Sequence, residues 1–121
     1  MKNLIIIGHP NIESFCYSGI FKTVKNSLSK NNEEIEVIDL YRDSFTRPRK
    51  KLIKKYQDLV TWSDRIYFIS PVWWFRLTPR MEIFFDEVFE PGFAYEFVNI
   101  TKLYAYPKPF LKNKKVRTYV T

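Results

Sequence analysis

The sequence predicts an α/β fold, a doubly wound parallel sheet with helices on both of its faces. Three observations support this class. Short apolar segments of strand length alternate along the chain with longer segments of helical periodicity. The first apolar segment lacks polar alternation, as in a strand that is buried on both faces. The chain has 121 residues without a repeat or a flexible linker, so a single domain, residues 1–121, is expected.

The first predicted strand and helix are separated by a short loop. Residues 4–7 are a continuous Leu and Ile run that stops at Gly8. Over residues 16–28, apolar side chains recur every four positions, which predicts a helix. Its expected N-cap is Ser14 or Asn11, because short polar side chains can accept from the free N–H groups of the first turn.

Two more strand and helix pairs are expected. Residues 35–40 and 66–69 read as strands, and residues 52–60 place apolar side chains on one face of a helix. Thr78 and Pro79 have the arrangement of an N-cap and a first helical residue, and they begin a third amphipathic helix.

The segment after this third helix is rich in aromatic residues and prolines and is predicted to be a loop. It leads to a fourth strand over residues 116–120, which makes the order βαβαβα-loop-β with right-handed crossovers. In such sheets a ligand binds beyond the carboxyl ends of the strands, where the strand order reverses. That position corresponds to the loops that begin at Gly8 and at Ser70.

Aromatic residues make up 18% of the chain, and several follow the third strand in the segment SPVWWF (70–75). They could be ordinary core, or they could contact a flat ligand. Because neighbouring side chains after a strand point in opposite directions, we expect one of Trp73 and Trp74 to be buried. The other would form, with Phe75, a wall for a planar ring. A second wall could come from three aromatic residues further along, Phe93, Tyr95 and Phe97.

The segment GHPNIESF (8–15) joins the first strand to the first helix. A helix N-terminus offers free N–H groups and a partial positive charge that suit a phosphate. His9 adds a donor and Ser14 adds a hydroxyl. The alternative is that His9 only caps a nearby backbone carbonyl, and the spacing matches neither of the common glycine-rich phosphate motifs.

The net charge of +7 is unevenly distributed. Residues 42–55 and 102–117 are strongly basic, whereas residues 82–96 are acidic. A basic surface is most often a solvated face, but it can also attract nucleic acid, an anionic membrane or a phosphorylated ligand. Nucleic acid is the least favoured of these partners.

Cys16 is the only cysteine, so an intrachain disulfide and a cysteine-based metal motif are both excluded, and no metal site is predicted. The apolar run at the N-terminus is too short for a signal peptide. No apolar stretch approaches the roughly 20 residues of a membrane span. We therefore expect a cytoplasmic protein.

Four segments, LIIIGHPNIESF, DLYRDSF, SPVWWF and FDEVFEPGFAYEF, occur in this order along the chain. Together they resemble the NAD(P)H:quinone oxidoreductase family of the flavodoxin-like fold, whose relatives include modulator of drug activity B and the ancillary oxidoreductase of glutathione-gated potassium efflux. The resemblance covers essentially the whole chain. It implies a sheet of strand order 2-1-3-4, with the family's fifth strand and last helices missing here.

The resemblance also implies a homodimer that binds FAD, or sometimes FMN, at each subunit interface. Such an enzyme takes a hydride from NADH or NADPH and passes two electrons to a quinone or similar aromatic acceptor in the same pocket. Alternatives are a regulatory subunit that contacts a membrane potassium-efflux protein, and an inactive truncated relic.

The site residues implied by the resemblance fall into three groups. The turn after the first strand would hold the cofactor's phosphate and ribityl groups through His9, Ser14, Phe15, Cys16 and Ser18. The isoalloxazine ring would lie against the main chain and side chains of Pro71, Val72, Trp73, Trp74 and Phe75. The substrate pocket would be closed by Tyr95 and Phe97 of the partner subunit, and no acid or base residue is expected.

The chain departs from the family pattern at several positions, among them Cys16, Arg76, the segment 78–84 and the short basic connection 43–56. Cys16 stands where many relatives have asparagine, which removes a polar contact to the cofactor. Arg76 replaces a small residue, and it could meet the phosphates of NADPH or crowd the entrance. Because the chain ends just after the fourth strand, that strand is expected to be an uncovered edge, and the chain is expected to be incomplete at its C-terminus.

Overall fold

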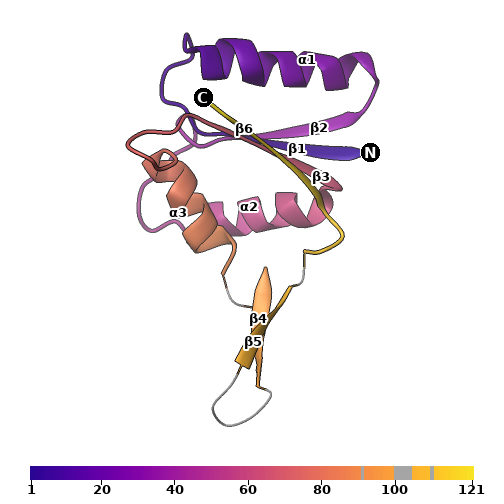
Figure 1. Cartoon of the computed structure of the whole chain (residues 1–121), viewed down its shortest axis with the longest axis vertical. Coiled ribbons are helices and arrows are strands. Elements are labelled where there is room, and N and C mark those ends of the chain that lie inside the picture. The colour runs from indigo at the N-terminus through magenta and orange to yellow at the C-terminus, as the bar shows by residue number, and fades with distance from the viewer. Residues whose placement is uncertain (91, 100–104, 110) are drawn as a thin grey trace.

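The computed structural model describes residues 1–90, 92–99, 105–109 and 111–121 (Figure 1). Its main sheet has four parallel strands, in the order β2-β1-β3-β6. The strands are β1 (Lys2–Ile7), β2 (Glu34–Asp39), β3 (Arg65–Ser70) and β6 (Lys115–Val120). The predicted fold class and the order 2-1-3-4 of the parallel strands are confirmed.

Helices cover both faces of this sheet (Figure 1). A π-helix, η1 (Phe15–Phe21), runs directly into α1 (Lys22–Lys30), and the two lie on one face. The opposite face carries α2 (Lys50–Trp62) and α3 (Pro79–Val88). None of the helices in the described part of the chain is long and apolar enough to cross a membrane.

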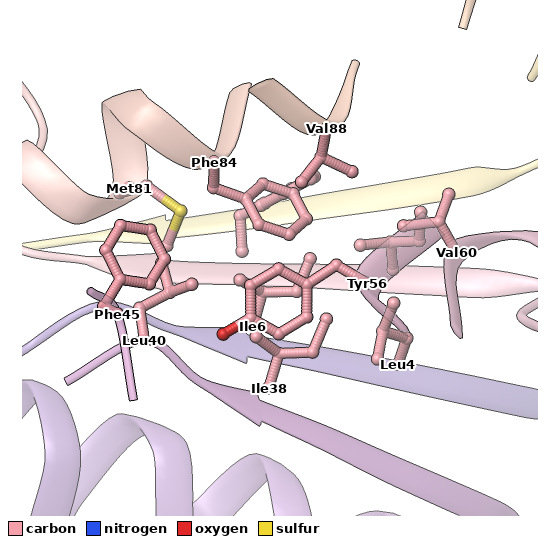
Figure 2. Packing of buried hydrophobic residues seen from close by; sticks show 12 residues of the cluster. Leu4, Ile6, Ile38, Leu40, Phe45, Tyr56, Val60, Met81, Phe84 and Val88 are labelled. Carbon is pink, nitrogen blue, oxygen red and sulfur yellow. The ribbon is translucent and has the colours of Figure 1, made fainter. Parts of the chain in front are cut away.

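Two hydrophobic cores result from the alternation of side chains along the strands. In β1, Leu4 and Ile6 point towards α2 and α3, whereas Ile5 and Ile7 point towards α1. The larger core, on the α2 and α3 side, contains Tyr56 and Phe84, which are both fully buried (Figure 2). The apolar run that predicted a strand buried on both faces therefore behaves as expected.

The segment after α3 differs from the prediction. Instead of a loop it contains an antiparallel hairpin of β4 (Tyr95–Asn99) and β5 (Ala105–Pro109), so the predicted loop was wrong. Proline cannot donate to a ladder, but both strands of a two-stranded sheet are edges, where Pro107 and Pro109 can be accommodated. The hairpin projects away from the sheet on the side where α3 ends (Figure 1).

The first helix begins as a π-helix, which the four-residue spacing did not predict. The expected N-cap is confirmed at Ser14, whose Oγ accepts from the Tyr17 N–H at 3.1 Å. Gly19 leaves room for the Phe15 ring, because a Cβ at Gly19 would lie 2.8 Å from two ring carbons of Phe15. π-Helical turns are rare and often occur at functional sites.

The strand β6 is an edge of the sheet, as expected, and its side chains are mostly exposed. Val116 and Val120 are each about half exposed. Just before the strand, the Lys114 ammonium donates to the backbone carbonyls of Thr61 and Ser63 at the end of α2. Burial lowers the pKa of Lys114. This lysine anchors the start of β6 to the helix beside it.

Candidate functional site

Backbone hydrogen bonds hold together the loops that leave the carboxyl ends of the strands. The Gly8 N–H donates to the Ile69 carbonyl at 2.9 Å, which ties the loop after β1 to the end of β3. The Val72 N–H donates to the Thr121 carbonyl at 2.9 Å, which ties the loop after β3 to the end of β6. The two loops that begin at Gly8 and at Ser70 thus lie together at the carboxyl end of the sheet.

Thr78 links the same two loops from the start of α3. It occupies the predicted N-cap position, but its side chain makes no capping bond to the helix. Its fully buried Oγ1 instead donates to the Gly8 carbonyl at 2.9 Å. A Cβ at Gly8 would lie 3.1 Å from both Thr78 Oγ1 and Met81 Cε, so glycine permits this close approach.

His9 follows Gly8, and its ring is held in one orientation. Nδ1 accepts from the Asn11 N–H at 2.9 Å, so the neutral ring carries its proton on Nε2. Burial, with a contribution from the positive charge of Arg42, lowers the pKa of His9. The alternative that His9 caps a backbone carbonyl does not hold for Nδ1, because this nitrogen accepts a hydrogen bond from the Asn11 N–H. His9 is thus a neutral side chain with an N–H available on Nε2.

The predicted residues of the first helical turn have different environments. Ser18 Oγ donates to the Ser14 carbonyl at 2.7 Å, and its own N–H donates to the same oxygen. Phe15 is largely exposed, whereas the Cys16 thiol is buried in the core on the α1 side, which raises its pKa. Within the described residues, the N–H groups of Phe15 and Cys16 have no partner, as expected for the first turn of a helix.

The segment Trp73–Arg76 forms a tight turn beside this loop. The Trp73 N–H donates to the Arg76 carbonyl at 2.6 Å, and the Arg76 N–H donates back at 3.0 Å. Trp74 and Phe75 between them have φ values of 52° and 65°, the pattern of a type I′ turn. A left-handed conformation at a bulky residue costs on the order of 1 kcal/mol, so two such residues store local strain.

The turn directs its rings into solvent. Trp73 is 40% exposed, Trp74 90% and Phe75 98%. The prediction that one tryptophan is buried was wrong, because the left-handed turn breaks the alternation of side chains that a strand would continue. The predicted wall of a tryptophan and Phe75 remains consistent with the exposure of Trp74 and Phe75.

The two loops approach each other through their rings. The centroids of His9 and Trp73 are 5.8 Å apart, with the rings nearly perpendicular. An aromatic surface therefore begins in the loop that leads into the first helix. This arrangement could hold a ligand that has a polar end at the helix and a flat end at the turn.

Part of the predicted main-chain donor set is already engaged within the chain. The N–H of Val72 donates to Thr121 and that of Trp73 to Arg76, so neither is free for a ligand. Pro71 is buried and has no N–H to donate. The N–H groups of Trp74 and Phe75, at the tip of the turn, are the donors that the turn can still present.

Tyr95 and Phe97 lie on β4, in the projecting hairpin. The turn at Trp73–Arg76 precedes α3, whereas the hairpin follows it, and ten helical residues span about 15 Å. Figure 1 shows the hairpin projecting beyond α2 and α3, across the direction of the strands, rather than at the end of the sheet that carries the two loops. Within one chain, these two residues are not brought to the other predicted site residues.

A group that the sequence analysis did not assign lies at the end of β2. The Arg42 guanidinium lies over the Tyr17 ring, 5.4 Å from its centroid, and Arg42 Nε is 3.9 Å from Asp39 Oδ2. Asp39 is paired in register with Ile7, the last residue of β1. The segment DLYRDSF indicates this position of Arg42, because a residue just after the end of a parallel strand lies at the carboxyl end of the sheet, where the loop after β1 also begins.

The fold and the two loops define a doubly wound α/β protein with a candidate ligand site at the carboxyl ends of its strands. Residues 1–121 match the family described as flavodoxin-like fold, and the chain belongs to that family.

Three relatives show how far the similarity extends. The chain is 36% identical over 95 residues to an uncharacterized NAD(P)H oxidoreductase, YdeQ, of Bacillus subtilis, a match that covers 78% of this chain and 45% of YdeQ. It is 25% identical to the structure of the NAD(P)H:quinone oxidoreductase from Methanothermobacter marburgensis, with a TM-score of 0.72 over 79% of this chain and 56% of that one. It is 28% identical to general stress protein 14 from Treponema denticola in complex with FMN, with a TM-score of 0.59 over 79% and 52% of the two chains. The chain thus spans about half the length of the curated relatives it matches.

Proposed function

We propose that this chain contributes the flavin site of an NAD(P)H-dependent oxidoreductase that reduces a quinone or another small aromatic acceptor. The observation that carries the proposal is the contact between the two loops, in which the His9 ring meets Trp73 at 5.8 Å. The relatives named as NAD(P)H oxidoreductase and NAD(P)H:quinone oxidoreductase support the reaction class. The relative in complex with FMN supports a flavin, with FMN favoured over the FAD that the resemblance implies.

The residues present fit such a cofactor. The phosphate end needs hydrogen-bond donors, and the His9 Nε2–H and the free N–H groups of Phe15 and Cys16 are of this kind. The ring end needs a flat apolar surface, and Trp74 and Phe75 expose nearly their whole side chains next to Trp73. Donors at one end and rings at the other match the two chemistries of a flavin phosphate.

When bound, a flavin supplies the two-electron chemistry, and the protein has to bind, orient and shield it. The first helical turn would hold the phosphate end at a fixed distance from the sheet. The rings of the Trp73–Arg76 turn would cover the flat end and exclude water from it. The N–H groups of Trp74 and Phe75 would donate to the polar edge of the ring system, where negative charge accumulates on reduction.

We also propose that two copies of the chain complete the substrate pocket. Tyr95 and Phe97 lie on a hairpin that projects beyond α2 and α3 of its own chain, a position that suits contact with a second copy (Figure 1). Sedimentation of the flavin-loaded chain as a dimer is the expected result, and a monomer that still reduces quinone would contradict this part.

Flavin binding is tested by titrating the chain with FMN and with FAD while tryptophan fluorescence is recorded. Trp62 lies on α2, whereas Trp74 lies at the proposed ring surface, so the two can be compared. The Trp62→Phe variant should keep the quenching, and the double variant Trp73→Phe with Trp74→Phe should lose most of it. We expect a Kd of about 10 µM or tighter and flavin-dependent oxidation of NADH or NADPH when a quinone is present. Equal quenching in both variants, or no binding at about 100 µM flavin, would show that the proposal is wrong.

A further inference from the structure

We propose that Arg42 binds the phosphate of the flavin and makes the site selective for phosphorylated flavins. This inference rests on the proposed flavin site and adds a residue to it. Arg42 is three residues beyond Asp39, which pairs with the last residue of β1. Arg42 therefore lies at the carboxyl end of the sheet, where the loop after β1 begins.

The position of the guanidinium beside the first helical turn follows from its contact with Tyr17. The guanidinium carbon lies 5.4 Å from the centroid of the Tyr17 ring. The N–H of Tyr17 donates to Ser14 Oγ, so Tyr17 belongs to the turn that offers the free N–H groups. The charge of Arg42 also contributes to the lowered pKa of His9.

Two neighbours orient Arg42 without using up its donors. The Tyr17 ring supports one face by a cation–π contact. Asp39 Oδ2 is 3.9 Å from Nε, which is beyond hydrogen-bonding distance, and Asp39 Oδ1 accepts instead from the Tyr41 N–H at 3.2 Å. Within the described part of the chain, the guanidinium forms no hydrogen bond, and its side chain is 35% exposed. A guanidinium has five N–H donors in a planar fork that matches a phosphate.

The charge of the site requires such a residue. A flavin phosphate carries close to two negative charges, whereas the end of a helix contributes only about half a positive charge. His9 adds a donor but, being neutral, no charge. Two other arginines are engaged more closely: Arg80 donates to the Leu40 carbonyl at 2.7 Å, and Arg76 Nε is 3.4 Å from Glu82 Oε1, compared with 3.9 Å between Arg42 Nε and Asp39 Oδ2. Arg42 therefore combines a positive charge with donors that form no hydrogen bond to the described residues.

The test compares three ligands that share the flat ring but differ in phosphate: riboflavin, FMN and FAD. Their affinities are measured by fluorescence titration for the wild-type chain and for Arg42→Gln and Arg42→Lys. Loss of a charge-assisted hydrogen bond predicts that Arg42→Gln weakens FMN and FAD by about ten- to a hundredfold. Riboflavin, which has no phosphate, should bind within about twofold of the wild type. Arg42→Lys should lie between the two, because lysine keeps the charge but not the fork.

Lys51→Gln is the matched control, because it removes one positive charge from an exposed position on α2. It should leave all three affinities unchanged. If Arg42→Gln binds FMN and FAD as tightly as the wild type does, or weakens riboflavin equally, the role of Arg42 is wrong while the flavin site stands. If the wild-type chain binds riboflavin, FMN and FAD equally weakly or not at all, the proposed function fails and the role of Arg42 fails with it. A preference of the wild type for FAD over FMN that Arg42→Gln abolishes would assign Arg42 to the second phosphate of the dinucleotide.

Discussion

Two groups of aromatic rings in this molecule have opposite surroundings. On the α3 side of the sheet, Tyr56, Phe68 and Phe84 pack against one another with centroid separations of 5.7 and 6.2 Å, and all three are buried. At the edge of the sheet, Trp74 and Phe75 are almost fully exposed on a left-handed turn. The first group stabilises the fold, whereas the second group is exposed at a cost in backbone strain.

The contrast separates rings of the core from rings that are available to a ligand. The buried rings sit on regular elements, where periodicity decides which face they occupy. The exposed rings sit where two successive residues adopt positive φ, a conformation that glycine or asparagine would adopt at lower cost. Bulky residues in such a position favour a functional explanation, because they contribute little to the core and strain the turn.

The largest expected effect in this comparison is on the buried group. Replacement of Phe84 by alanine removes a fully buried ring between α3 and the sheet and should lower the free energy of unfolding by about 3–5 kcal/mol. Phe85, the next residue, is partly exposed, and its replacement by alanine should cost about 1 kcal/mol. Urea unfolding measures both. Equal losses for the two variants would contradict the assignment of Phe84 to the core.

A smaller effect is expected at the junction between core and site. Thr78→Val keeps the shape of the side chain but removes the hydrogen bond to the buried Gly8 carbonyl, so it should cost about 1–3 kcal/mol. Thr78→Ser, which keeps the hydroxyl, should retain most of the stability. Because the bond positions the loop that carries His9, Thr78→Val should also weaken FMN binding at temperatures where it is folded. A variant with unchanged stability would show that this bond does not hold the two loops together.

The smallest effect on stability is expected at the exposed turn. The double variant Trp74→Asn with Phe75→Gly introduces the pair that type I′ turns prefer, and should leave stability unchanged or raise it by up to about 1 kcal/mol. The same variant should lose flavin affinity, because both exposed rings are gone. If urea unfolding showed that this variant is less stable and flavin titration showed an unchanged affinity, the assignment of the exposed rings to ligand binding would be wrong.

Most of the regular elements could be predicted from the sequence, because each has a pattern that depends on its own residues. The Leu and Ile run before Gly8 is β1, and the polar residue before the first helix, Ser14, is its cap. The hairpin of β4 and β5 could not be recognised in the same way. Its prolines argued for a loop, and only the pairing of one strand with the other made them acceptable.

The approach of the two loops of the candidate site was predictable from the sequence, but the orientation of their side chains was not. The general behaviour of parallel sheets predicts that the loops that begin at Gly8 and at Ser70 meet at the carboxyl end of the sheet, and the contact of His9 with Trp73 agrees with this. The orientation of the tryptophans was not predictable, since it depends on two positive φ values in the turn. Arg42 lies over the Tyr17 ring because the end of β2 comes close to the first helix. The two residues are far apart in sequence, so no local pattern predicts this contact.

The sequence alone indicates the four parallel strands, the helices between them, the faces that these elements bury and the end of the sheet at which the two loops meet. These properties follow from periodicity and from short-range capping, which act between residues close along the chain. Three other features depend on tertiary contacts or on the backbone of a turn: the hydrogen bond from Thr78 to Gly8, the position of Arg42 over Tyr17, and the exposure of the rings at the Trp73–Arg76 turn. The first two depend on residues that are distant in sequence, and the third depends on a strained backbone. None of the three has a local sequence pattern that predicts it.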